Sequence, residues 1–294
     1  MSEIIKLGTV QKHLVEVSPF LYDGRLLMFE SVRPRTPDNT HGGDHYLRIR
    51  ELGGGTGDVG SAEEFADGKL LTEFGDGMTF GVPFVWDDTV YVYATLADKP
   101  EVDDIFLFWS NDMSMWQQRV VVAGQDERLF NCSVCRAGDR FVMSYESNDK
   151  TWPAFTIKFA ESDDLMSWRK ISTDEAIYGT DRYTACPSLR FLDGYFYMWY
   201  LEKRGGHLSQ GDDDWFFETF LTRSQDLLDW QQSPANPILT PAPSEDINNS
   251  DIDFCEFEES MIIYYSWGSQ RGEENLAHAS YDGTLISWIL ASYA

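Results

Sequence analysis

The 294-residue sequence contains no run of 18 apolar residues, which is about the minimum for a helix that crosses a membrane. Its first residues, Met1-Ser2-Glu3, lack the basic region and the apolar core of an export signal. Phosphate loops, dinucleotide fingerprints and His/Cys zinc spacings are also missing. These absences predict a soluble, cytoplasmic protein that works without an organic cofactor.

Basic residues are scarce. The chain has 23 Lys and Arg against 49 Asp and Glu, which gives a net charge of −26. A surface of this charge repels nucleic acids and anionic membranes, so we expect neither as a partner. The composition does not determine the oligomeric state, and a homo-oligomer is possible.

Cysteine is rare too, with four residues at positions 132, 135, 186 and 255. The spacing Cys132-x-x-Cys135 resembles a metal or redox motif. On a β-strand, however, residues three apart point to opposite faces, so these two thiols cannot bind one ion. We expect buried, free thiols in a reducing compartment.

What the sequence does contain is a repeated hairpin: an apolar strand, a tight polar turn and an aromatic-rich strand. The copies lie at residues 17–29, 82–93, 132–145, 186–200 and 254–265, with turns that begin at 23, 87, 138, 193 and 258. Hairpins that recur every 51 to 65 residues, without long helices between them, are typical of propeller blades. The sequence predicts an all-β protein, a single five-bladed β-propeller over residues 1–294 with four antiparallel strands per blade.

A second repeat, Ser-x-Asp-x-x-x-Trp, follows three of the hairpins at residues 110–116, 162–168 and 224–230, and residues 280–288 hold a stretched version. We interpret it as a structural turn, in which Ser and Asp cap backbone amides and Trp packs between neighbouring sheets. In the first blade the third and fourth strands are expected near residues 45–51 and 69–74. Residues 4–10 are expected to pair with the last blade and close the ring.

The propeller geometry defines where a site must lie. The starts of the innermost strands and the ends of the second strands meet on one face, around the axis. The polar and aromatic residues predicted there, as substrate-binding positions, are Glu30, Arg33, Arg35, His41, Asp44, His45, Asn131, Asp181, Arg182, Tyr183, His207, Asp253, Trp267, Gln270 and Arg271. Carboxylates and Arg suit sugar hydroxyls, aromatic faces suit C–H surfaces, and paired acids suit a glycosidic bond.

With these features the chain resembles the five-bladed propeller glycoside hydrolases, the arabinanase/β-xylosidase and invertase/levansucrase group (families 43, 32, 62, 68 and 117). The likeness covers nearly the whole chain and includes Ala185-Cys186-Pro187 before the fourth hairpin. It implies a glycosidase. Three positions where these relatives carry acids hold Ser18, Asn131 and Ala185 instead.

The catalytic acids are therefore expected elsewhere around the axis, among Glu16, Glu146, Glu202 and Asp251. A histidine of the loops, such as His41, His45 or His207, is an alternative acid. Alternation along the strand places Asp251 and Asp253 on one side of it. The separation of the acid pair would distinguish retention from inversion. An axial calcium or similar cation, held by Asp251 or Asp253, stays open.

The resulting prediction is an exo-acting glycosidase for a small oligosaccharide or glycoside. The cluster of Arg33, Arg35, Arg182 and Arg271 suggests an acidic sugar, because Arg binds carboxylates bidentately. Alternatively, each Arg holds a neighbouring acid in place. Two further functions stay open: a phosphorylase or transglycosidase on the same fold, and a sugar-binding propeller without catalysis.

Overall fold

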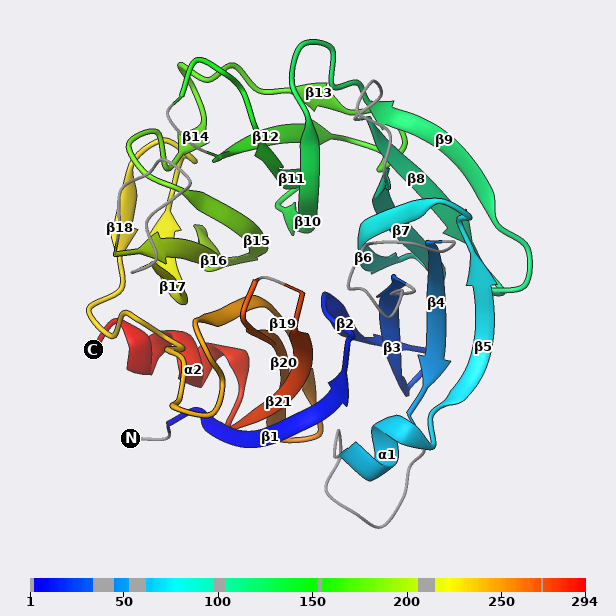
Figure 1. The fold of residues 1–294 in the computed structure, drawn as a ribbon. Helices are drawn as coiled ribbons and strands as arrows, with labels where there is room; N and C mark the ends of the chain where they lie inside the picture. The colour runs from blue at the N-terminus through cyan, green and yellow to red at the C-terminus, as the bar shows by residue number, and fades with distance from the viewer. Residues whose placement is uncertain are drawn as a thin grey trace.

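The computed structural model describes residues 3–33, 45–52, 62–97, 104–152, 155–205, 215–270 and 272–294. In these ranges the chain forms five antiparallel sheets that follow one another around a central axis (Figure 1). The predicted five-bladed β-propeller is confirmed. One parallel bridge between Phe217 and Asn248 links the fourth and fifth blades.

Each blade has four strands from the axis outward, and the third has a fifth short strand. Blade one contains β2 (Val17–Tyr22), β3 (Arg25–Val32), β4 (Tyr46–Glu51) and β5 (Lys69–Phe74), and blade two contains β6 (Met78–Trp86), β7 (Thr89–Leu96), β8 (Ile105–Ser110) and β9 (Gln117–Val122). Blade three contains β10 (Leu129–Ala137), β11 (Arg140–Ser147), β12 (Thr156–Ser162), β13 (Arg169–Lys170) and β14 (Ile177–Tyr178). Blade four contains β15 (Thr184–Leu192), β16 (Tyr195–Arg204), β17 (Phe216–Ser224) and β18 (Trp230–Gln232), and blade five contains β19 (Asn248–Phe257), β20 (Ser260–Gly268), β21 (Glu274–Asp282) and β1 (Ile5–Lys12). Two short helices, α1 (Ala62–Ala66) and α2 (Leu285–Ser292), complete the described elements.

Strand β1 closes the ring. It pairs antiparallel with β21, so the beginning of the chain supplies the outermost strand of the last blade (Figure 1). The predicted pairing of residues 4–10 is confirmed, and the observed strand is two residues longer at its end. Closure gives the fifth blade the four strands of the others and covers the edge of β21.

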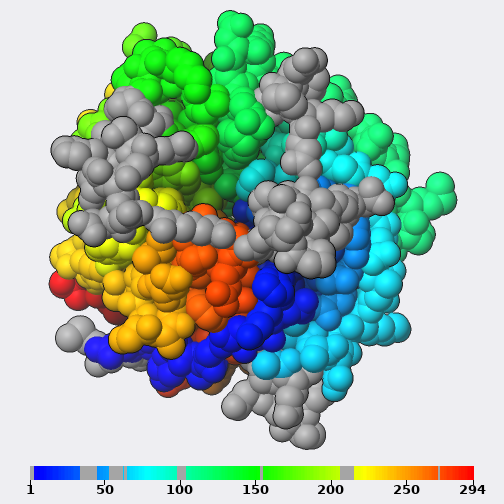
Figure 2. All heavy atoms as spheres, viewed as in Figure 1, coloured from blue at the N-terminus to red at the C-terminus, as the bar shows by residue number. Residues whose placement is uncertain are grey.

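The hydrophobic core lies between the blades. Adjacent residues of each second strand point to opposite neighbours, so Phe29 packs toward blade two while Met28 packs toward blade five. The same alternation occurs in blade three, where Met143 and Val142 belong to different interfaces. A strand buried on both faces reads as a continuous apolar run, which is the pattern of the five hairpins. Side chains fill the spaces that the ribbon leaves between blades (Figure 2).

The repeated turn acts as predicted. In the third blade, the Asp164 carboxylate accepts hydrogen bonds from the backbone N–H groups of Met166 (2.8 Å) and Ser167 (2.7 Å), and from the Ser162 hydroxyl. The Trp that ends each turn contacts a ring of the preceding blade, in the pairs Trp116–Phe74, Trp168–Tyr93 and Trp230–Phe159. The motif therefore fastens each blade to the one before it.

The stretched copy at residues 280–288 differs from this prediction. Residues 285–292 form helix α2, with Thr284 as the N-cap that accepts from Ser287 N–H. Trp288 nevertheless packs between blades, against Trp199 of blade four and Phe254 of blade five. The helix thus takes over the packing role of the turn.

The cysteines are free, as predicted, and Cys132 and Cys135 lie in core clusters on opposite faces of blade three. Cys186 and Cys255 are only partly buried, which differs from the expectation of four buried thiols. In the part of the chain that the structure describes, no helix has both the length and the apolarity to span a membrane.

Candidate active site

Five residues at the starts of the innermost strands share an unusual backbone conformation. Glu16 (φ 57°), Phe80 (φ 53°), Asn131 (φ 31°), Cys186 (φ 50°) and Asp251 (φ 51°) all have positive φ, one in each blade. In blades two to five each of these residues lies within a shift of the strand register, which marks a bulge. A non-glycine residue in this region costs about 1–3 kcal/mol, and such strain is concentrated at functional sites.

These bulges surround a recess of about 50 Å³ on the axis. Residues of all five inner strands line it: Glu16, Val17, Ser18, Phe80, Gly81, Val82, Asn131, Cys132, Ser133, Cys186, Pro187, Ser188, Asp251, Ile252 and Asp253. Two predicted acids, Glu16 and Asp251, thus reach one recess from neighbouring blades.

Glu16 is paired with the guanidinium of Arg33, and both side chains are 12% exposed. Arg33 also donates from Nε to the Thr79 hydroxyl (3.0 Å) and lies over the ring of Phe80, 4.4 Å from its centre. Burial raises the pKa of Glu16 to about 8; Arg33 opposes this rise and the charge of Asp251 adds to it. Burial thus favours the protonated form of Glu16, and the pairing with Arg33 favours the ionised form.

Asp251 and Cys186 are in contact. The Asp251 carboxylate accepts from the Ser250 hydroxyl at 2.9 Å and is hydrogen-bonded to the Cys186 side chain. Burial, followed by the negative charges of Asp251, Glu146 and Glu16, raises the pKa of the Cys186 thiol well above its usual value. Cys186 is thus a neutral thiol whose pKa is influenced by the charges of three carboxyl groups.

Glu146 comes from the end of β11 and is 5% exposed. Its carboxylate accepts from the side-chain amide of Asn131 (3.0 Å) and from the backbone N–H of Cys186 (3.3 Å). Burial raises the pKa of Glu146 to about 7, and the charge of Asp251 contributes to the rise. Asn131, where relatives were expected to carry an acid, therefore holds a neighbouring acid in place.

The arrangement is suited to acid–base chemistry. Burial raises the pKa values of Glu16 and Glu146, and the Asp251 side chain lies close enough for its charge to contribute to both shifts. Carboxyl groups whose environments differ in this way can divide the roles of proton donor and base or nucleophile. In the described residues, no group of three or more His, Cys, Asp or Glu side chains is placed to hold a metal ion.

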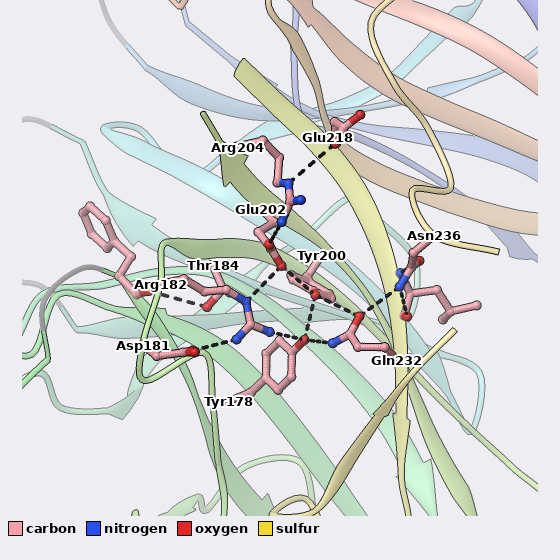
Figure 3. A network of polar contacts seen from close by, with 12 residues as sticks. Tyr178, Asp181, Arg182, Thr184, Tyr200, Glu202, Arg204, Glu218, Gln232 and Asn236 are labelled. Carbon is pink, nitrogen blue, oxygen red and sulfur yellow. Dashed lines mark hydrogen bonds and ion pairs between the residues drawn. The ribbon is translucent and has the colours of Figure 1, made fainter. Parts of the chain in front are cut away.

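The structure does not bring Glu202 to the recess, contrary to the expectation for this residue. Its carboxylate accepts from Arg182 Nε (2.9 Å), Arg204 Nη1 (2.7 Å) and the Tyr200 hydroxyl (3.0 Å). Tyr178 and Gln232 extend this network between blades three and four (Figure 3). Glu202 and Arg182 therefore satisfy each other's charge in a structural network. Asp181 is exposed and pairs with Arg182.

Glu30 also differs from its expected place. It is fully buried and is held by Arg48 and by Arg50 (2.5 Å). Arg50 lies over the ring of Phe65 in α1, so this ion-pair group fastens the helix to blade one. Glu30 is not among the residues that line the recess.

Asp253 lines the recess, and an ion pair with Arg190 compensates its charge there. It accepts from Arg190 Nη2 (2.7 Å) and from the Ser188 hydroxyl (3.0 Å). Asp253, Val82 and Ser133 also line a larger cavity of about 440 Å³ toward the opposite end of the axis. Because Arg190 and Asp253 compensate each other, that cavity lacks the group of closely spaced acids found in the recess.

The remaining predicted residues lie around this centre. Tyr183 packs against Phe155 and Phe217, and burial followed by the charge of Glu146 raises its pKa well above the usual value. His45 is buried, and its backbone carbonyl accepts from Gly77 N–H. Trp267 donates to the Thr9 hydroxyl of β1, away from the recess lining, and Gln270 lies in the loop after β20. Arg35, His41, Asp44, His207 and Arg271 fall outside the described residues.

Two of the five bulge residues, Phe80 and Cys186, were not among the predicted site residues. A sequence signal for both exists, because all five bulge residues lie seven positions before the first residue of their hairpin turn. Aligning the hairpins by their turns would have placed Cys186, rather than Tyr183, at the axis in blade four. The site is thus set by one offset that is repeated five times.

The fold has been observed before. Compared by sequence, the chain matches no protein-family model and no curated protein. Compared by structure, it matches the catalytic domain of a family 62 α-L-arabinofuranosidase from Coprinopsis cinerea, with a TM-score of 0.68, 10% identity and 95% and 97% of the two chains covered. It also matches the α-L-arabinofuranosidase of Podospora anserina solved with cellotriose (TM-score 0.63, 9% identity, 96% and 97% covered). The family 43 endo-arabinanase of Bacillus licheniformis matches with a TM-score of 0.57, 10% identity and 91% and 93% covered.

These matches extend over nearly the full length of both chains. The protein therefore has the fold of the five-bladed propeller glycoside hydrolases, and the predicted resemblance is confirmed at the level of the fold.

Proposed function

We propose that the protein is a glycoside hydrolase that cleaves a terminal sugar in the axial recess. The observation that carries this proposal is the group of Glu16, Glu146 and Asp251, which come from three different blades. Their side chains influence one another's charge, as the causes of the raised pKa values of Glu16 and Glu146 show. Similarity to structures named as arabinofuranosidases and an arabinanase supports the same class of reaction.

Glu16 is the proposed general acid and Asp251 the proposed base or nucleophile. Both line the recess, whereas Glu146 lies behind it, against Asn131 and Cys186. Glu16, with a pKa of about 8, transfers its proton to the glycosidic oxygen as the bond to the leaving group breaks. Asp251 either takes a proton from the attacking water or attacks the sugar itself.

The shape of the recess supports exo action. Inner strands of all five blades close it laterally, so a substrate enters along the axis, with the end of its chain. Ser18 and Ser188 add hydroxyl groups on its wall that can bond sugar hydroxyls. Arg33 is engaged by Glu16, so its proposed task is to orient the acid.

Leaving-group dependence tests the two roles. Glu16→Gln should lower kcat/KM about 10²–10⁴-fold on a glycoside with a poor leaving group, and far less on an activated aryl glycoside that departs without a proton. Asp251→Asn should lose activity on both. The wild-type kcat/KM should fall as pH rises through about 8, because Glu16 is then deprotonated.

Glu258→Gln is the matched control. Glu258 lies in the exposed turn after β19, so this variant should retain full activity. Unchanged turnover in both site variants would contradict the assignment. Sugar binding without any turnover would favour a non-catalytic propeller, and a requirement for phosphate would favour a phosphorylase.

A further inference from the structure

Half-buried aromatic rings form a continuous arc beside the recess. Each ring centre lies 5.0–5.7 Å from the next, in the order Phe80, Phe130, Phe155, Tyr183, Phe217 and Trp215. The arc starts at the recess, which Phe80 lines, and crosses blades two, three and four. All of its members lie at the starts of first or third strands, which is the face of the propeller that carries the recess.

The arc is not explained by the core. Phe80, Phe130 and Phe155 belong to none of the hydrophobic clusters between the blades, although all three are large apolar side chains. Tyr183, Phe217 and Trp215 belong to a small separate cluster that includes Cys186 of the recess. Five of the six rings are only partly buried. Apolar rings that lie outside the core clusters and keep part of their surface exposed can contact a ligand.

Hydrogen-bond donors accompany the rings. Arg33 lies over Phe80, Arg128 over Phe130 at 5.1 Å, and Lys203 over Trp215 at 4.8 Å. A ring with a charged donor beside it matches a sugar unit, which presents C–H groups on its face and hydroxyl groups at its edge. The combination occurs at the first, second and last rings of the arc.

We propose that this arc is a chain of sugar-binding subsites, so that the substrate is an oligosaccharide whose end occupies the recess and whose other units lie over blades two to four. This inference rests on the proposed function for the position of the chain end. It extends that function, because a monosaccharide glycoside would contact Phe80 alone and leave the rings of blades three and four without a role.

Chain-length dependence tests the arc. The probes are arabino-, xylo- and galacturono-oligosaccharides of two to five units, assayed for turnover and, with Asp251→Asn, for binding by calorimetry. In whichever oligosaccharide series the protein cleaves or binds, kcat/KM or affinity should rise at least about tenfold from two to four sugar units. Trp215→Ala and Phe155→Ala should remove most of this rise, and Trp215→Phe should keep it.

Phe216→Ala is the matched control, because Phe216 is exposed and makes none of the ring contacts of its neighbours Trp215 and Phe217. The proposed subsites would be contradicted if the wild-type kcat/KM and affinity do not depend on chain length. A Trp215→Ala variant that keeps the full rise would contradict them too. Absence of both binding and turnover in all three series would overturn the arc as well. Length-dependent binding without cleavage would instead reject the proposed hydrolase and leave the arc standing. A preference for the galacturonate series would identify the ligand as acidic.

Discussion

The buried carboxyl group of Glu146 lowers the stability of the folded protein at pH values where it is ionised. Its pKa of about 7 in the folded protein lies above the usual value of 4.5, so the folded state binds more protons than the unfolded state between these two pH values. The stability contributed by the protonated form is complete below pH 4.5 and is lost as the pH rises through about 7. At pH 8 the protein therefore holds a poorly solvated charge at this position.

Glu146→Gln should remove that cost. A glutamine carbonyl can still accept from Asn131 and from Cys186 N–H, and it carries no charge. We expect the free energy of unfolding to increase by about 1–3 kcal/mol at pH 8 and to change little at pH 4.5. Urea unfolding at both pH values measures the difference. Glu259→Gln, in an exposed turn, should show no such pH dependence, and a Glu146→Gln variant that is less stable at pH 8 would contradict the argument.

Individual site residues were only partly predictable from the sequence. Glu16 and Asp251 were expected at the recess, and the structure places them there. Glu30 and Glu202 follow the same pattern, a carboxylate at the end of a second strand, but Arg side chains of the same blades capture them. Whether such an acid forms an ion pair depends on Arg residues in other segments. The sequence pattern of one strand carries no information about them.

Among the elements, the repeated turn makes a testable contribution to stability. Asp164 is exposed, and its carboxylate accepts from two backbone N–H groups of the turn. Burial opposes the effect, but the hydrogen bonds from Ser167, Met166 and Ser162 together lower the pKa of Asp164 below its usual value. The stabilisation is thus present above the usual aspartate pKa and is lost as the pH falls through the lowered value.

Asp164→Ala should lower the free energy of unfolding by about 0.5–2 kcal/mol at pH 7, as the loss of a helix cap does. The neighbouring Asp163 is exposed and makes no hydrogen bond in the described structure, so Asp163→Ala is the matched control. Urea unfolding of the two variants at pH 7 and at low pH should show a difference that disappears in acid. Equal stability at pH 7 would mean that water replaces the carboxylate without cost.

The same turn shows what a repeat can and cannot predict. Three copies have the spacing Ser-x-Asp-x-x-x-Trp and form the expected turn, whereas the longer spacing before Trp288 allows a helix with its own N-cap at Thr284. Packing of the Trp between blades is common to both solutions. The interface demands an aromatic ring at that place, and the local sequence determines the backbone that supplies it.

For the molecule as a whole, five hairpins with a period of 51 to 65 residues were sufficient to predict the architecture. The reason is physical: a hairpin that is apolar on both faces is stable only when a similar sheet covers each face, and a closed ring supplies such a cover for every copy. The arc of aromatic rings was not predictable in this way. Its members come from first and third strands of different blades and become neighbours only after the ring closes.

At the seam of the ring, a partly buried ion pair joins β1 to the loop before β19. Lys6 of β1 donates to Glu245 (2.5 Å), to Asn249 Oδ1 (2.6 Å) and to the backbone carbonyl of Thr240 (2.8 Å). Glu245 also accepts from the Tyr265 hydroxyl at 2.6 Å. Burial opposes the effect, but these donors lower the pKa of Glu245, so the pair stabilises the protein above the usual glutamate pKa and less so in acid.

Lys6→Met should leave the Glu245 carboxylate with too few partners and lower the free energy of unfolding by about 1–3 kcal/mol at pH 7. Lys12→Met is the matched control, because Lys12 lies in the same strand, is exposed and forms no ion pair in the described structure. The loss should also be local: β1 should be cleaved faster in limited proteolysis of Lys6→Met, since fewer side-chain contacts then hold it to blade five. If the two variants unfold alike and β1 resists cleavage equally in both, backbone pairing alone closes the ring, and the charges at its seam contribute nothing.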